Sequence, residues 1–218
     1  MDNFLFRLVF FSSLLATLVS QAQKVQKYNL SGLLKDGKLI HTHAQQVSII
    51  DAFNGRAVTA KGVILLKHVT FSTGSIDVDM RGRDVFQQSF VGIAFHAVDT
   101  ITYEAIYFRP FNFPSTDTLR DKHMVEYISE PEYPWYRLRK EHPLVYENTV
   151  TPLVKPTDWF HVHIVVSDEW VTVYVNHWQV ASLKVKKLSN RTDGLIGLWT
   201  DGQALSGDFA NLEIKQDK

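Results

Sequence analysis

The chain has 218 residues, no cysteine and a formal net charge of zero. A balanced charge argues against a broad nucleic-acid or anionic-membrane surface, because both need an excess of positive side chains. The length fits one all-β domain. Without disulfides, the stability of such a domain has to come from packing.

The first residues have the order of a secretory signal peptide. Arg7 precedes an apolar run from Leu8 to Val19, and Ser20-Gln21-Ala22 offers small residues for cleavage. The apolar run is short for a membrane span. We therefore expect residues 1–22 to be removed and residues 23–218 to form a single domain without a transmembrane span, secreted or periplasmic. The alternative is a buried N-terminal helix.

Strand patterns follow along the chain, and no long segment has the 3.6-residue period of a helix. The first candidates are short and flank the turn signal Phe53-Asn54-Gly55. The segment 75–81 alternates apolar residues at even positions with charged residues at 77, 79 and 81. The full set of predicted strands comprises residues 47–51, 56–60, 63–66, 75–81, 89–97, 102–109, 122–129, 159–166, 170–176, 179–185, 194–200 and 207–214.

The strand at 89–97 carries small residues on one side. Gly92 and Ala94 leave that face thin just before His96, as the floor of a groove requires. In the following strand, Tyr103 and Tyr107 share one face with Arg109.

If the strands at 102–109 and 122–129 pair, we expect His123 and Tyr127 to join this tyrosine face. Proteins bind sugars by stacking aromatic rings on them and by fixing their hydroxyls with polar groups. The alternative is a solvated outer face of tyrosines, which is common in sandwiches.

Residues 110–156 form a proline- and aromatic-rich loop insert. All seven prolines fall between Pro110 and Pro156, which favours loops and sheet edges. A long aromatic loop is uncommon unless it binds something or packs down as a lid. We expect Trp135 and Arg139 to fold back over the 103–109 strand and close one side of a groove. The alternative is that both residues only pin the loop to the sheet.

The segment 159–185 is the clearest pattern in the chain, an antiparallel meander of three strands. Its apolar residues alternate with histidine, threonine, tyrosine and tryptophan, so one face is apolar and the other polar. The apolar face needs a second sheet to cover it. The sequence therefore predicts an all-β fold, a two-sheet antiparallel jelly-roll β-sandwich with almost no helix.

Three motifs together resemble the concanavalin A-like lectin/glucanase superfamily. They are Phe71-x-x-Gly74 before the 76–78 strand, Trp159-Phe160-x-Val162 before the 171–176 strand, and Gly194-x-Ile196-Gly197-Leu198-Trp199 with Asp208-Phe209-x-Asn211-Leu212-x-Ile214. The resemblance covers about residues 47–214. Within the superfamily, the chain is similar to bacterial exported laminin G-like and 3-keto-disaccharide hydrolase-like domains.

The resemblance to the 3-keto-disaccharide hydrolase-like family implies a strand with Ser-Gly before an arginine, followed by a strand opening with Tyr-Glu. Tyr103-Glu104 matches the second strand, but His96 stands where arginine is expected. The superfamily's glycosidases use two acidic residues on one strand face. Asp77 and Asp79 have that spacing, but no third acidic residue follows at the same spacing. The resemblance therefore assigns no catalytic triad to this chain.

Glu104 and Glu126 are the candidate catalytic residues. Each shares a strand face with apolar residues, where a carboxylate is costly unless it is paired. Two such carboxylates in one cleft would suit a glycosidase acid/base pair. The alternative, which we favour, is a structural Glu–Arg pair that anchors the loop insert.

Metal binding is weakly indicated. His161 and His163 have the i, i+2 spacing that two metal ligands can use, but exposed strand histidines are the simpler interpretation. Asp99 and Asp117 offer the oxygen ligands that calcium takes, although nothing in their spacing demands it. We therefore predict no metal site and no cofactor, with calcium left as an open alternative.

The functional prediction is an exported, lectin-like domain whose partner is a carbohydrate or glycoconjugate. The alternatives are a glycoside-cleaving hydrolase and a structural or surface-assembly domain without a small ligand. The predicted ligand-binding residues are His96, Tyr103, Tyr107, Arg109, Asn112, Tyr127, Trp135 and Arg139.

Overall fold

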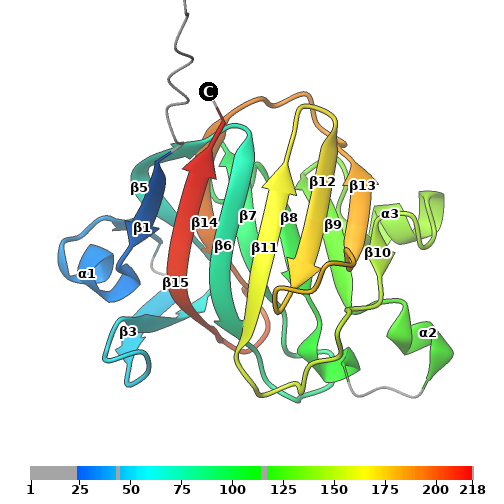
Figure 1. Ribbon diagram of the computed structural model, residues 1–218, viewed down its shortest axis with the longest axis horizontal. Helices are drawn as coiled ribbons and strands as arrows, with labels where there is room; N and C mark the ends of the chain where they lie inside the picture. The colour runs from blue at the N-terminus through cyan, green and yellow to red at the C-terminus, as the bar shows by residue number, and fades with distance from the viewer. Residues whose placement is uncertain (1–23, 43–44, 114–116, 218) are drawn as a thin grey trace, which may run out of the picture.

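The computed structural model describes residues 24–42, 45–113 and 117–217. These segments form two antiparallel sheets stacked face to face, with sheet A in front of sheet B in Figure 1. The predicted sandwich is therefore confirmed. The predicted signal peptide lies outside the described residues, and no helix among those residues is long and apolar enough to cross a membrane.

Sheet A has eight strands, in the order β13-β12-β11-β6-β15-β4-β3 with β1 also paired to β15. Their bounds are β1 Val25–Tyr28, β3 Gln46–Ile50, β4 Ala57–Lys61, β6 Gly74–Arg81, β11 Phe160–Val166, β12 Trp170–Val175, β13 Leu183–Lys186 and β15 Gly207–Gln216. The meander predicted at 159–185 is β11, β12 and β13, which lie side by side. Its last strand is shorter than expected and begins only at Leu183.

Sheet B has seven strands, in the order β10-β9-β8-β7-β14-β5-β2. Their bounds are β2 Leu39–Ile40, β5 Val63–Phe71, β7 Val91–Ala97, β8 Tyr103–Phe108, β9 Val125–Glu130, β10 Glu147–Asn148 and β14 Gly194–Trp199. Residues of β7 and β8 are buried on both faces of the sheet. Sheet A covers the inner face, so something else has to cover the outer one.

The core lies between the two sheets, as the alternating patterns predict. The even residues of β6 and β11 and the odd residues of β12 point into it and are buried. From sheet B, Ile93, Phe95, Ile106 and Phe108 belong to the same apolar cluster.

The insert at 110–156 is more ordered than a loop. Besides β9 and β10 it contains the 3₁₀ helix η1 Pro110–Asn112 and the helices α2 Thr118–Asp121 and α3 Trp135–Glu141, while α1 Leu30–Lys35 lies near the N-terminal end of the described chain. In α3 only Leu138 is buried, and it packs on the outer face of sheet B. Helices this short leave no readable 3.6-residue period, which is why the sequence predicted loop there.

Candidate functional site

The outer face of sheet B carries an aromatic floor built around Gly92. Gly92 of β7 pairs with Tyr107 of β8 on one side and with Trp199 of β14 on the other. With no side chain between them, the two rings meet, with centroids 4.6 Å apart and planes at 33°. The face of β7 that carries only the small residues Gly92 and Ala94, predicted as the floor of a groove, therefore lies beneath these aromatic rings.

Tyr103 completes the floor. The indole Nε1 of Trp199 donates a hydrogen bond to the Tyr103 hydroxyl at 3.0 Å. Burial raises the pKa of Tyr103 to about 12, and the nearby carboxylates of Glu130 and Asp201 add to the shift. The hydroxyl therefore stays protonated at neutral pH, with Glu130 and Asp201 both near it.

A groove of about 870 Å³ opens above this floor. Helix α3 forms one wall, where Trp135 is 46% exposed and the Arg139 guanidinium lies 5.2 Å from its ring centroid. Residues that line the groove include Thr42, Gln45, Val63, Phe90, Tyr103, Tyr107, Arg109, Phe111, Asn112, Arg120, His123, Glu130, Trp135, Arg139, Trp199 and Asp201.

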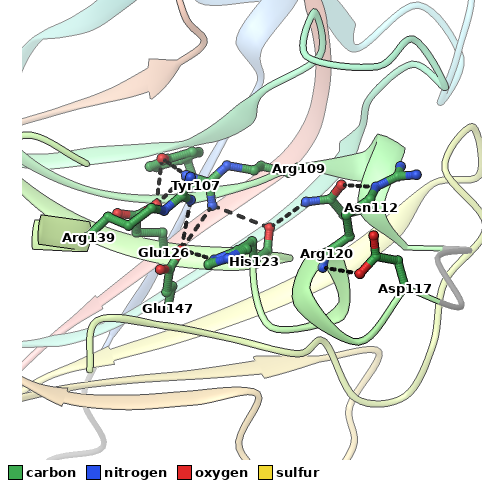
Figure 2. Close-up of polar contacts among 9 residues, drawn as sticks. All are labelled: Tyr107, Arg109, Asn112, Asp117, Arg120, His123, Glu126, Arg139 and Glu147. Atoms are coloured by element: carbon green, nitrogen blue, oxygen red, sulfur yellow. Dashed lines mark hydrogen bonds and ion pairs between the residues drawn. The ribbon is translucent and has the colours of Figure 1, made fainter. Parts of the chain in front are cut away.

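A buried ion pair lies beneath the groove wall. Arg109 donates hydrogen bonds to the Glu126 carboxylate and to the Tyr107 hydroxyl, and that hydroxyl donates to Glu126 at 2.8 Å (Figure 2). Burial, together with nearby Glu147, raises the pKa of Glu126, although Arg109 opposes the shift. The three side chains, Tyr107, Arg109 and Glu126, hold one another in a single arrangement, because each polar group has a hydrogen-bond partner where water is excluded.

Two further connections extend this network along the wall. Glu147 lies 3.0 Å from Arg139 Nη2 and 3.7 Å from Arg109 Nη1. On the other side, the His123 carbonyl accepts from Arg109 Nη1 and from Asn112 Nδ2. The row of polar side chains therefore runs from Arg139 through Arg109 to Asn112, as Figure 2 shows.

The structure brings together six of the predicted ligand-binding residues. All six line the groove, and they are Tyr103, Tyr107, Arg109, Asn112, Trp135 and Arg139. The sequence missed Trp199 and Arg120. Trp199 could have been found, because it lies near the end of a predicted strand, 194–200, whose other face carries Ile196 and Leu198. Nothing in the sequence places Arg120 beside Asn112.

His96 and Tyr127 lie elsewhere, in the core between the sheets. Tyr127 pairs with Ile106, so it shares the inner face of β8 rather than the tyrosine face. His96 has a positive φ of 46° at an irregularity in the β7–β14 pairing, which breaks the alternation. Neither side chain lines the groove, so the prediction that they belong to a groove with Tyr103 and Tyr107 is wrong for these two residues.

Glu104 and Glu126 do not form an acid/base pair, because they lie on opposite faces of sheet B. Glu104 points into the core, where it accepts hydrogen bonds from His96, Tyr127 and Ser189. Burial would raise the pKa of Glu104, but these three bonds outweigh it and hold the pKa below its usual value. Glu126 lies on the groove side with Arg109, which agrees with the favoured interpretation of a structural Glu–Arg pair.

The polar face of sheet A carries His161 and His163 opposite Asp77 and Asp79. His161 bridges the two aspartates at 3.2 and 2.9 Å, and His163 contacts Asp77 at 2.7 Å. Hydrogen bonds that His161 donates to Asp77 and Asp79 raise the pKa of His161 to about 9. Within the described ranges, no group of three or more acidic, histidine or cysteine side chains is arranged to hold a metal ion.

The aspartates considered for calcium have local roles. Asp99 accepts from the backbone N–H groups of Ile101 and Thr102, and Asp117 accepts from those of Leu119 and Arg120 at the start of α2.

Comparison with known proteins bears on the fold. No protein-family model and no curated protein matches the chain. Among solved structures, the chain is similar to a putative glycosyl hydrolase from Parabacteroides distasonis, with a TM-score of 0.59 and 14% identity over 88% of this chain and 100% of that one. The fold is that of the concanavalin A-like lectin/glucanase sandwiches.

Two other solved structures agree with this assignment. The carbohydrate-binding module CBM66 from Bacillus subtilis has a TM-score of 0.51 and 13% identity, over 78% of this chain and 94% of that one. A Bacillus subtilis protein of unknown function with a galectin-like fold has a TM-score of 0.56 and 11% identity, over 88% and 94%. At these identities the likeness concerns the fold alone.

Proposed function

We propose that this protein is an exported carbohydrate-binding domain that holds a glycan in the groove on the outer face of sheet B. The observation that carries the proposal is the composition of the groove. An aromatic floor lies beside a row of fixed polar side chains, Arg109, Asn112 and Arg139. Sugars present apolar ring faces and a rim of hydroxyls, and these two kinds of surface match them.

Trp135 is the aromatic ring best placed to stack on a sugar. Tyr107 and Trp199 are only 2% and 7% exposed and contact each other, so they shape the floor. Trp135 is far more exposed, and Arg139 lies against its ring. A sugar ring that stacks on this indole would also reach the Arg139 guanidinium.

The fold supports the same function, since one similar solved structure is described as a carbohydrate-binding module. The order of residues 1–22 supports export, with cleavage after Ala22. N-terminal sequencing of the mature protein checks the export step. An intact Met1 in a cytoplasmic fraction would contradict it.

A glycan array probed with the mature protein tests the binding step. We expect a restricted set of glycans to bind, and soluble oligosaccharide of the same type to compete. If no glycan on a broad array binds, the alternative of a structural or surface-assembly domain without a small ligand gains support.

A glycoside hydrolase is the second candidate, favoured by one observation. Glu130 and Asp201 both line the groove near the Tyr103 hydroxyl, and burial raises the pKa of Glu130 as a general acid requires. Incubation of the protein with the glycans that it binds, followed by measurement of new reducing ends, separates the two functions. Release of reducing ends that is lost in Glu130→Gln indicates the enzyme. Tight binding without release indicates the binding domain.

A further inference from the structure

The wall of the groove beyond the C-terminal end of β8 carries a guanidinium that no carboxylate neutralises. Arg120 of α2 donates from Nε to Asn112 Oδ1 at 3.1 Å and from Nη2 to the Phe111 carbonyl. Both acceptors are uncharged. The aromatic ring of Phe86 lies 4.8 Å from the guanidinium carbon. Arg120 is therefore held in place by neutral groups while its full positive charge remains.

The other two arginines of the wall differ from Arg120 in this respect. Arg109 pairs with Glu126, and Arg139 pairs with Glu147. Among residues 24–42, 45–113 and 117–217, no ion pair and no hydrogen bond from Nη1 is found for Arg120. Within the described residues, the three guanidinium groups of the row thus pair with only two carboxylates, those of Glu126 and Glu147, and the guanidinium without a carboxylate partner is that of Arg120.

The negative groups that line the groove lie away from this position. Glu130 pairs with Tyr103, at the opposite end of β8 from Arg109 and Asn112. The carboxylate of Asp201 raises the pKa of Tyr103 by its charge, and it accepts a hydrogen bond from the backbone N–H of Gln203. A ligand in the groove therefore meets a positive site near Asn112 and carboxylates near Tyr103.

We propose that the groove selects an acidic glycan and that Arg120 binds its carboxylate or sulfate group. The planar guanidinium suits such groups, because it offers several N–H donors in a fixed geometry and keeps its charge at all working pH values. Asn112, whose amide oxygen orients Arg120, would face the same sugar. This inference rests on the proposed carbohydrate-binding function and adds the chemical class of the ligand.

Matched pairs of glycans that differ only in charge test the inference. The probes are an oligogalacturonide with its fully methyl-esterified form, and a sulfated galactan oligosaccharide, which contains no uronic acid, with its desulfated form. They are compared with a panel of neutral oligosaccharides by calorimetry on the native protein. We expect at least one acidic probe to bind about tenfold or more tightly than its uncharged partner, with a preference that weakens in high salt. The two pairs distinguish carboxylate from sulfate.

Variants then locate the charge effect. In Arg120→Gln the preference for the acidic probe should disappear, while Arg120→Lys should keep part of it. Arg137→Gln is the matched control, because Arg137 lies in the same insert but pairs with Glu141 and does not line the groove. This control should leave the affinity unchanged. Melting temperatures of all three variants show whether each remains folded.

Each outcome bears on one of the two proposals. A neutral glycan that binds as tightly as every acidic probe overturns the inference and leaves carbohydrate binding intact. An acidic preference that survives unchanged in folded Arg120→Gln overturns the role of Arg120. If no probe and no glycan on the array binds, the proposed function itself fails, and the inference fails with it.

Discussion

Tyr107 and Trp199 lie in contact across Gly92, with ring centroids 4.6 Å apart, although one belongs to β8 and the other to the closing strand β14. A Cβ atom at position 92 would lie 2.1 Å from the Ile106 carbonyl oxygen and 2.7 Å from the Tyr107 backbone. The contact between the rings therefore depends on glycine, because any side chain there would push β8 and β7 apart.

Gly92→Ala should accordingly destabilise the protein by about 3 kcal/mol or more, since backbone atoms have to move to admit the methyl group. Urea denaturation measures the loss. Gly202→Ala is the control, because a Cβ atom there has no neighbour within 4 Å. Equal stability of the two variants would mean that the strands tolerate a side chain beneath the rings.

Trp135→Ala should weaken glycan binding about tenfold or more, because it removes the exposed stacking surface of the groove. Its melting temperature should change by only a few degrees, since the indole is half exposed. The matched control is Trp178→Ala, which removes an indole that is 50% exposed and does not line the groove. If both variants bind the glycan as tightly as the native protein, the stacking role of Trp135 is wrong.

Glu104→Ala should cost about 3–5 kcal/mol of folding free energy, because it leaves the buried polar groups of His96 and Tyr127, and the partly buried hydroxyl of Ser189, without their acceptor. The control is Glu141→Ala, which breaks only the exposed pair with Arg137 and should cost about 0–1 kcal/mol. Chemical denaturation compares the two. Similar losses would contradict the buried network.

Val173→Asp should be among the most damaging single substitutions, at roughly 4 kcal/mol or more, because it places an unpaired charge between the sheets. Thr172→Asp is the control on the opposite face of β12, where the side chain is only partly buried. A melting temperature that Val173→Asp leaves unchanged would place Val173 on the surface.

The ion pairs of His161 with Asp77 and Asp79 should make stability depend on pH. The folded pKa of His161 is about 9, above its unfolded value of 6.5. The contribution of His161 to the free energy of unfolding is therefore complete below pH 6.5 and is lost as the pH rises through 9. Burial would raise the pKa of Asp77, but the hydrogen bonds and charges of His161 and His163 outweigh burial and lower it. The contribution of Asp77 to the free energy of unfolding is therefore lost as the pH falls below about 4.

Denaturation of the native protein and of Asp77→Asn across this range measures the effect. The difference in unfolding free energy should be largest, on the order of 2 kcal/mol, between about pH 4 and pH 6.5. It should shrink by pH 9.5. A difference that stays constant with pH would show that the histidine–aspartate pairs add no net stability.

The sequence predicted the sandwich well because period-two alternation depends only on which face of a strand is buried. The even residues of β6 and β11 and the odd residues of β12 all lie in the core as expected. The same parity placed Tyr103 and Tyr107 together on one face of their strand, and the structure shows that this is the outer face of sheet B. Both lie there, within the groove.

Pairing register could not be predicted in the same way. Tyr107 pairs with Glu126, and a shift by one residue would have placed Tyr127 beside it on the same face. Tyr127 lies in the core as a result. His96 was misplaced for a different reason, since a positive φ reverses the direction of its side chain and no local pattern signals it.

The position of α3 shows what the amino-acid composition of residues 110–156 could predict and what it could not. Clustered prolines, aromatics and arginines pointed to residues 110–156 as one side of a groove, and Trp135 and Arg139 of this insert line the groove in the structure. They did not reveal that Trp135 and Arg139 share a short helix anchored by Leu138. Such an anchor depends on a tertiary contact with sheet B.

The most direct measurement of the central claim is a crystal structure of the protein with the tightest-binding oligosaccharide from the glycan array. The account predicts a sugar ring stacked on Trp135, with its hydroxyl or acidic groups within hydrogen-bond distance of Arg139, Asn112 or Arg120. A sugar bound only on the polar face of sheet A, beside His161 and Tyr174, would contradict it.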